Sequence, residues 1–68
     1  MTVASKLKQT LATLKGNQST LRLYSLQTRD EETKLVYRET LETAGIIIND
    51  LEGRLQTLEL QEPQYKGN

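Results

Sequence analysis

The most regular pattern in the chain is a stripe of apolar residues in its second half, spaced at alternating steps of four and three. This spacing places residues on one face of a single α-helix. The stripe consists of Tyr37, Leu41, Ala44, Ile48, Leu51, Leu55 and Leu58. We therefore predict a helix over about residues 31–61, ended by Pro63, because the residue before a proline avoids helical backbone geometry.

A second stripe with the same spacing runs through the first half of the chain, although it includes polar residues. Its members are Ala4, Leu7, Leu11, Leu14, Gln18, Leu21, Ser25 and Thr28. The stripe predicts a helix over about residues 3–28, with Thr2 or Ser5 as its N-cap. The pair Gly16-Asn17 is the weak point, because a glycine inside a helix costs about 1 kcal/mol relative to alanine. Since the stripe keeps its phase across this pair, we predict one continuous helix, with a kink there as the alternative.

The segment between the two stripes breaks the helical pattern and can begin a new helix. Thr28 and Glu31 have the spacing of a capping box, and Asp30 is a second candidate N-cap. The acids Asp30, Glu31 and Glu32 suit the positive end of a helix. Because so short a connection forces neighbouring helices to run antiparallel, we predict an all-α fold in which residues 1–62 form a two-helix hairpin.

Folding the chain about residue 31 brings the two stripes together, with facing residues whose numbers add up to 62. We expect ion pairs across the hairpin between Lys8 and Lys15 on one helix and Glu52 and Glu59 on the other, which would favour this register. The predicted hairpin core is Leu7, Leu11, Leu14, Leu21, Leu41, Ile48, Leu51, Leu55 and Leu58.

Several large apolar residues lie outside both stripes and would be exposed on a lone hairpin. A chain of 68 residues without cysteine also lacks disulfides, so association is the remaining common way to stabilise it. We expect a homodimer that forms a four-helix bundle, or a higher homo-oligomer; the alternative is a different protein docking on the same surface. The predicted interface residues are Leu23, Leu26, Ile46 and Ile47.

Charge is balanced over the whole chain but separated along it. Residues 1–28 carry four bases and no acid, whereas residues 29–68 carry five bases and nine acids. Pairing of the two helices explains this separation. The alternative is that the bases Lys8, Lys15, Arg22 and Arg29 bind nucleic acid or an anionic membrane surface, against which the net charge of zero argues.

The composition offers little for catalysis. The sequence contains neither histidine nor cysteine, which removes the commonest general base, the thiol nucleophile and the commonest metal ligands. Glu39 and Glu42 have helical spacing for a metal pair, but both face away from the apolar stripe. We expect no enzyme activity, cofactor, metal, small-molecule substrate or nucleic acid. Without a signal peptide or a membrane-spanning stretch, a soluble cytoplasmic protein is expected.

The last six residues, 63–68, are expected to form a flexible tail. The segment Glu62-Pro63-Gln64-Tyr65-Lys66-Gly67 places an aromatic residue between a proline and a lysine. Such a segment could serve as a short peptide ligand, or it could be an ordinary frayed terminus.

Several motifs resemble those of a known family. They are Met1-Thr2-Val3, Lys8-Gln9-Thr10-Leu11-Ala12-Thr13-Leu14-Lys15-Gly16, Leu26-Gln27-Thr28 and the segment from Glu62 to Gly67. Together they resemble the small proteins of endospore-forming Firmicutes grouped as domain of unknown function 1657. The resemblance implies genes near those for stage V sporulation channel proteins and a YetF-like membrane protein. It thus implies a role in sporulation or spore resistance, a location in the forespore or spore and a membrane-protein partner, but no catalytic residues.

Overall fold

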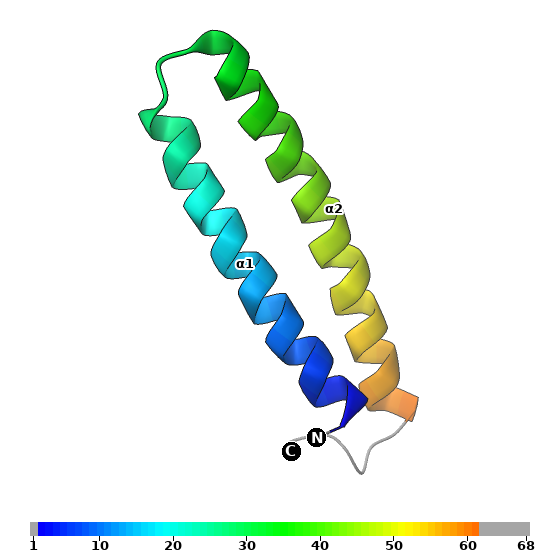
Figure 1. The fold of residues 1–68 in the computed structure, drawn as a ribbon. Coiled ribbons are helices and arrows are strands. Elements are labelled where there is room, and N and C mark those ends of the chain that lie inside the picture. The colour runs from blue at the N-terminus through cyan, green and yellow to red at the C-terminus, as the bar shows by residue number, and fades with distance from the viewer. Residues whose placement is uncertain (1, 62–68) are drawn as a thin grey trace.

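The computed structural model describes residues 2–61, which form two long helices joined by a short loop (Figure 1). Helix α1 spans Val3–Gln27 and helix α2 spans Glu31–Gln61. The two helices lie side by side and run antiparallel, so that the start of α1 meets the end of α2. The molecule is a rod of 49 × 16 × 12 Å. The predicted hairpin is therefore confirmed.

The ends of α1 follow from local hydrogen bonds. Thr2 is the N-cap, because its Oγ1 accepts a hydrogen bond from the Ser5 backbone N–H at 3.0 Å. Thr28 has extended backbone, and its N–H donates to the Tyr24 carbonyl at 3.0 Å, so α1 ends one residue earlier than predicted. The helix is unbroken through Gly16-Asn17, as the phase of its stripe predicted.

Asp30 begins α2. Its Oδ2 accepts a hydrogen bond from the Thr33 backbone N–H at 2.9 Å and another from the Thr33 hydroxyl. These hydrogen bonds to the charged form lower the pKa of Asp30 below its ordinary value of 3.8. Glu31 and Glu32 follow in the first turn, where the helix dipole favours acids. Of the two candidate caps, Asp30 is the one whose side chain holds the first turn.

The core between the helices is one layer thick. Ala4, Leu11 and Ile48 are 4 to 6% exposed. Within residues 2–61, no side chain is completely buried. The other predicted core positions are half-buried: Leu7, Leu14, Leu21, Leu41, Leu51, Leu55 and Leu58. The contact stabilises the hairpin, but it leaves much apolar surface in water.

The register of the hairpin is visible in its polar contacts. Lys8 pairs with Glu59, and Lys15 pairs with Glu52, as the sequence predicted. A methyl group on Gly45 would stand 3.7 Å from Nε2 of Gln18, so this polar side chain of the α1 stripe lies beside a glycine that leaves it room.

Candidate interaction surfaces

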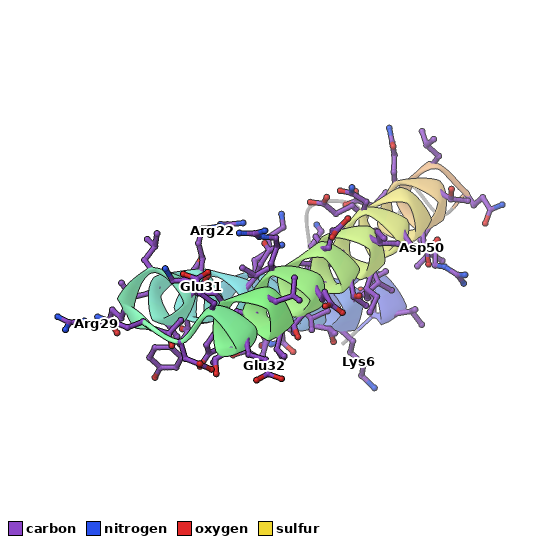
Figure 2. All side chains as sticks on the ribbon, turned by 90° about the horizontal axis from the view of Figure 1, so that it is seen from above. Lys6, Arg22, Arg29, Glu31, Glu32 and Asp50 are labelled. Atoms are coloured by element: carbon purple, nitrogen blue, oxygen red, sulfur yellow. The ribbon has the colours of Figure 1, made fainter. Side chains whose placement is uncertain are left out.

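Each helix presents four kinds of position, which are defined by their place relative to the apolar stripe. Stripe residues face the other helix. A residue directly after a stripe residue flanks the contact on one broad side of the rod, and a residue directly before one flanks it on the other. Where two stripe residues are four positions apart, the residue halfway between them points outward, away from the other helix. Figure 2 shows the result: Arg22 and Glu31 lie on one broad side, and Lys6 lies on the opposite one.

The broad side that follows the stripe residues is rich in charge, and we call it the charged side. Lys8 Nζ lies 3.0 Å from Glu59 Oε2, and Lys15 Nζ lies 2.6 Å from Glu52 Oε2. The two lysine side chains are 42% and 53% exposed, so each pair contributes only about 0.2–1 kcal/mol. The pairs fix the register of the helices more than they hold them together.

These ion pairs also change which bases are open to an anionic partner. Lys8 and Lys15 are occupied by acids of α2. Continuing the same register toward the loop places Arg22 opposite Gly45, and Arg38 follows Tyr37 on the same side of α2, whereas Arg29 lies in the loop between the helices. Within the described part of the chain, none of these three arginines makes an ion pair. The unpaired arginines therefore lie in and near the loop, with Arg22 and Arg38 on the charged side.

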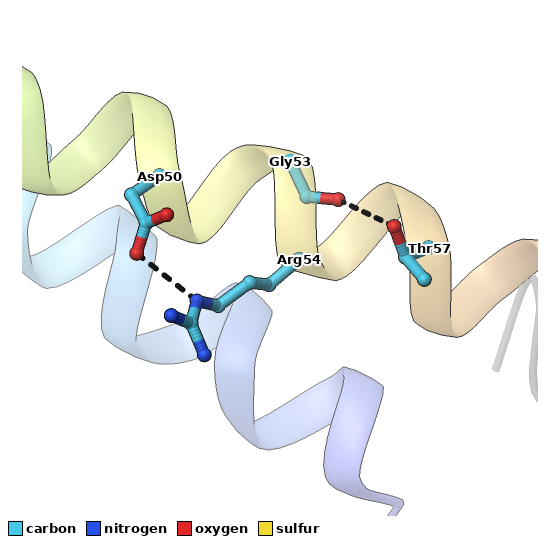
Figure 3. A network of polar contacts seen from close by, with 4 residues as sticks. All are labelled: Asp50, Gly53, Arg54 and Thr57. Atoms are coloured by element: carbon cyan, nitrogen blue, oxygen red, sulfur yellow. Dashed lines mark hydrogen bonds and ion pairs between the residues drawn. The ribbon is translucent and has the colours of Figure 1, made fainter.

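The opposite broad side carries threonine where the charged side carries lysine and glutamate, and we call it the threonine side. Its threonines directly precede stripe residues on both helices: Thr10, Thr13, Thr20, Thr40, Thr43 and Thr57. The charged residues that precede stripe positions are Lys6, Asp50 and Arg54. Asp50 and Arg54 neutralise each other, with Arg54 Nε 3.0 Å from Asp50 Oδ2 (Figure 3).

Most threonine hydroxyls of this side donate a hydrogen bond within their own helix. Five of the threonines donate to the carbonyl oxygen four residues earlier, at distances of 2.9 to 3.2 Å. Figure 3 shows one of them, in which Thr57 donates to the Gly53 carbonyl. Because the hydroxyl proton already has an acceptor, burying these five side chains would leave no hydroxyl donor without a hydrogen-bond partner.

The apolar residues left exposed are not spread evenly around the rod. Four of the nine large ones lie on the threonine side: Val3, Tyr24, Val36 and Ile47. Leu26 and Leu35 lie on the charged side, and Leu23, Ile46 and Leu60 point outward. Shallow hollows also open on the threonine side of α2, one lined by Thr40, Thr43 and Ile47 and another by Leu7, Leu51, Leu58 and Thr57.

The four predicted interface residues are all exposed, but they do not form one patch. Leu23 lies midway between Leu21 and Ser25, and Ile46 lies midway between Ala44 and Ile48, so they point away from the hairpin in opposite directions. Leu26 belongs to the charged side and Ile47 to the threonine side. One partner surface cannot cover all four.

Glu39 and Glu42 are exposed on α2. No three acidic side chains among residues 2–61 come together as metal ligands. Neither α1 nor α2 contains, within these residues, an apolar stretch long enough to cross a membrane. The predicted tail, residues 63–68, and the recognition segment that begins at Glu62 lie outside the described residues.

Comparison with known proteins gives a family but no relative of known role. A family model described as protein of unknown function (DUF1657) matches residues 7–55. The matched segment begins at Leu7 and ends at Leu55, which face each other in the register of the hairpin, so it contains the loop and most of both helices. The motifs at the two ends of the chain, Met1-Thr2-Val3 and Glu62 to Gly67, lie outside the matched segment. No curated protein and no solved structure matches the chain.

Proposed function

The chain belongs to the DUF1657 family, and we propose that it is a non-enzymatic structural protein that works by associating with copies of itself. The observation that carries this proposal is the thinness of the core. Ala4, Leu11 and Ile48 are the buried residues of the described chain, and nine large apolar residues are between 47 and 79% exposed. Full burial of each such side chain is worth about 1.5–3 kcal/mol. Association is the available route to that stabilisation.

The composition supports the non-enzymatic part of the proposal. Without histidine and cysteine, the chain has no side chain whose ordinary pKa lies near neutral pH and no thiol nucleophile. Six of the eight acids among residues 2–61 are exposed, and the other two, Glu52 and Glu59, pair with lysines of α1. A helical adaptor that presents a long rigid surface needs none of these groups.

The resemblance to proteins encoded beside sporulation genes supports a role for this adaptor in sporulation or spore resistance. The protein would then act in the cytoplasm of the forespore or in the spore, with a membrane protein as a further partner. Partner capture from sporulating cells, with the purified protein as bait and a non-associating variant as control, tests this part of the proposal.

The self-association itself is tested by light scattering over a dilution series, with helicity followed by circular dichroism. We expect the mass of a dimer or a higher oligomer at high concentration and a loss of helicity as dilution dissociates it. A monomer of unchanged, high helicity at every concentration would overturn the proposal, because the hairpin would then be stable without a second copy.

A second candidate function rests on the unpaired arginines in and near the loop. Arg22, Arg29 and Arg38 lack ion-pair partners within residues 2–61 and could bind nucleic acid or an anionic membrane surface. This function predicts binding that weakens steeply as salt rises and that disappears when all three are replaced by glutamine. Replacing Lys8 and Lys15 instead should leave it nearly unchanged, since those lysines are already paired with acids.

A further inference from the structure

The hairpin has two broad sides of equal size, and they differ in what covering them would require. On the charged side, a partner would have to cover Lys8, Lys15, Glu52 and Glu59, and it would meet the unpaired arginines near the loop. Removing charges from water is unfavourable unless each finds a partner of opposite sign. The threonine side makes no such demand along most of its length.

From these observations we infer that the threonine side is the surface on which a second copy of this chain docks. The inference rests on the proposed self-association and specifies its interface. Exposed apolar side chains are most numerous there, with Val3, Tyr24, Val36 and Ile47 between 47 and 66% exposed. The threonines between them contribute methyl groups, and five of their six hydroxyls already donate to carbonyl oxygens of their own helix.

The dimensions of this side fit a second copy. A broad side of 49 × 16 Å has a footprint of about 800 Å², which is the area that each partner contributes to an interface of standard size. Two hairpins stacked on this side would place four helices around one core, which is the ordinary arrangement of a four-helix bundle.

The charge distribution also favours a like partner. In a symmetric dimer the same patch meets itself, so a strongly charged patch would repel its copy. Asp50 and Arg54 cancel each other on the threonine side, and Lys6 lies near the open end of the rod. A surface this close to neutral meets its own copy without repulsion, whereas a partner chosen by charge would use the other side.

Neighbouring residues allow a matched test on each helix. Ile47 lies on the threonine side, and Ile46 points outward. Ile47→Glu should raise the dissociation constant of the oligomer by about 100-fold or more, because a buried unpaired charge is strongly unfavourable. Ile46→Glu carries the same chemical change one residue away and should keep the parent mass in light scattering.

A second pair of substitutions, at Thr13 and Ala12, ensures that misfolding is not mistaken for loss of association. Thr13 lies on the threonine side and Ala12 on the charged side, and both are exposed on α1. Lysine is a good helix former, so Thr13→Lys and Ala12→Lys should both keep the hairpin helical. Thr13→Lys is expected to dissociate the oligomer, and Ala12→Lys is expected to leave it intact.

The outcomes separate this inference from the proposed function. Loss of association confined to Ile47→Glu and Thr13→Lys supports the threonine side. An oligomer that survives these two substitutions, or that is lost equally with Ile46→Glu and Ala12→Lys, overturns the assignment while self-association stands. A parent protein that is a helical monomer at every concentration overturns self-association itself.

Discussion

Gly16 and Gly53 offer the sharpest test of how the hairpin is stabilised. Both lie inside long helices, and a Cβ atom added at either position would meet no atom within 4 Å. Replacing a glycine by alanine in a helix interior stabilises by about 0.8–1.0 kcal/mol when the new methyl group meets open space. Since the two glycines lie on different helices and share no neighbour, Gly16→Ala and Gly53→Ala together should add about 2 kcal/mol.

Thermal unfolding followed by circular dichroism at one fixed protein concentration measures this change. For a chain of this size, 1 kcal/mol corresponds to about 4–8 °C in Tm, so each alanine should raise Tm by about that amount. The fixed concentration matters because association makes Tm depend on concentration. The reverse change at an exposed helical position, Ala12→Gly, is the control and should lower Tm by a similar amount.

The result that refutes this reasoning is a Tm that stays constant or falls for both alanine variants while the control behaves as expected. Helix propensity would then not limit the stability of the rod. A gain from Gly16→Ala with a loss from Gly53→Ala would have a narrower meaning. It would show that the outward face of α2 at Gly53 is covered by another molecule, since within the described chain that face is open.

Three further predictions concern the core, the cap and the register. Ile48→Ala, at a position 6% exposed, should destabilise the hairpin by about 2–3 kcal/mol, which is at the low end for buried residues because the thin core can collapse around the missing side chain. Urea unfolding measures this change in the free energy of unfolding. A change below about 0.5 kcal/mol would mean that the stripe is not the core. Hydrogen bonds from Thr33 lower the pKa of Asp30, so this N-cap stabilises α2 above about pH 4, and the contribution is lost as pH falls through the lowered pKa. Asp30→Asn should flatten that part of the curve of Tm against pH. An unchanged slope would exclude the cap as the source of the pH dependence. Lys15→Glu places like charges together at Glu52 and should lower stability by about 0.5 kcal/mol, Lys15→Glu with Glu52→Lys should restore it, and equal stability of the single and the double variant would exclude this pair.

The fold could be predicted from the sequence because one periodic signal specifies both the helices and their register. The stripes from Ala4 to Thr28 and from Tyr37 to Leu58 keep a single phase, and the short link between them permits only an antiparallel arrangement. Thr2 and Asp30 are standard capping residues at the expected positions. The pairs Lys8 with Glu59 and Lys15 with Glu52 then follow from helix geometry alone.

Hydrophobicity alone does not single out one docking surface, because residues off the stripe point in three directions. Leu23, Leu26, Ile46 and Ile47 share exposure and apolar character, but only their angular position shows that they belong to different faces. Threonine is a polar residue type, so the sequence alone does not mark these positions as a surface that a partner could cover. Their hydrogen bonds to the carbonyls four residues earlier, as at Thr40, change that character, and such bonds are visible only in the folded chain.

The best-buried residues of the hairpin lie away from its loop. Ala4, Leu11 and Ile48 all belong to the half of the rod near its open end, whereas the half near the loop is joined through half-buried residues such as Ser25 and Thr28. Backbone amides open locally where packing is weakest. Amide hydrogen exchange should therefore be slowest around Leu11 and Ile48 and faster in the helical turns beside the loop. Local opening of the rod would then begin at its loop end.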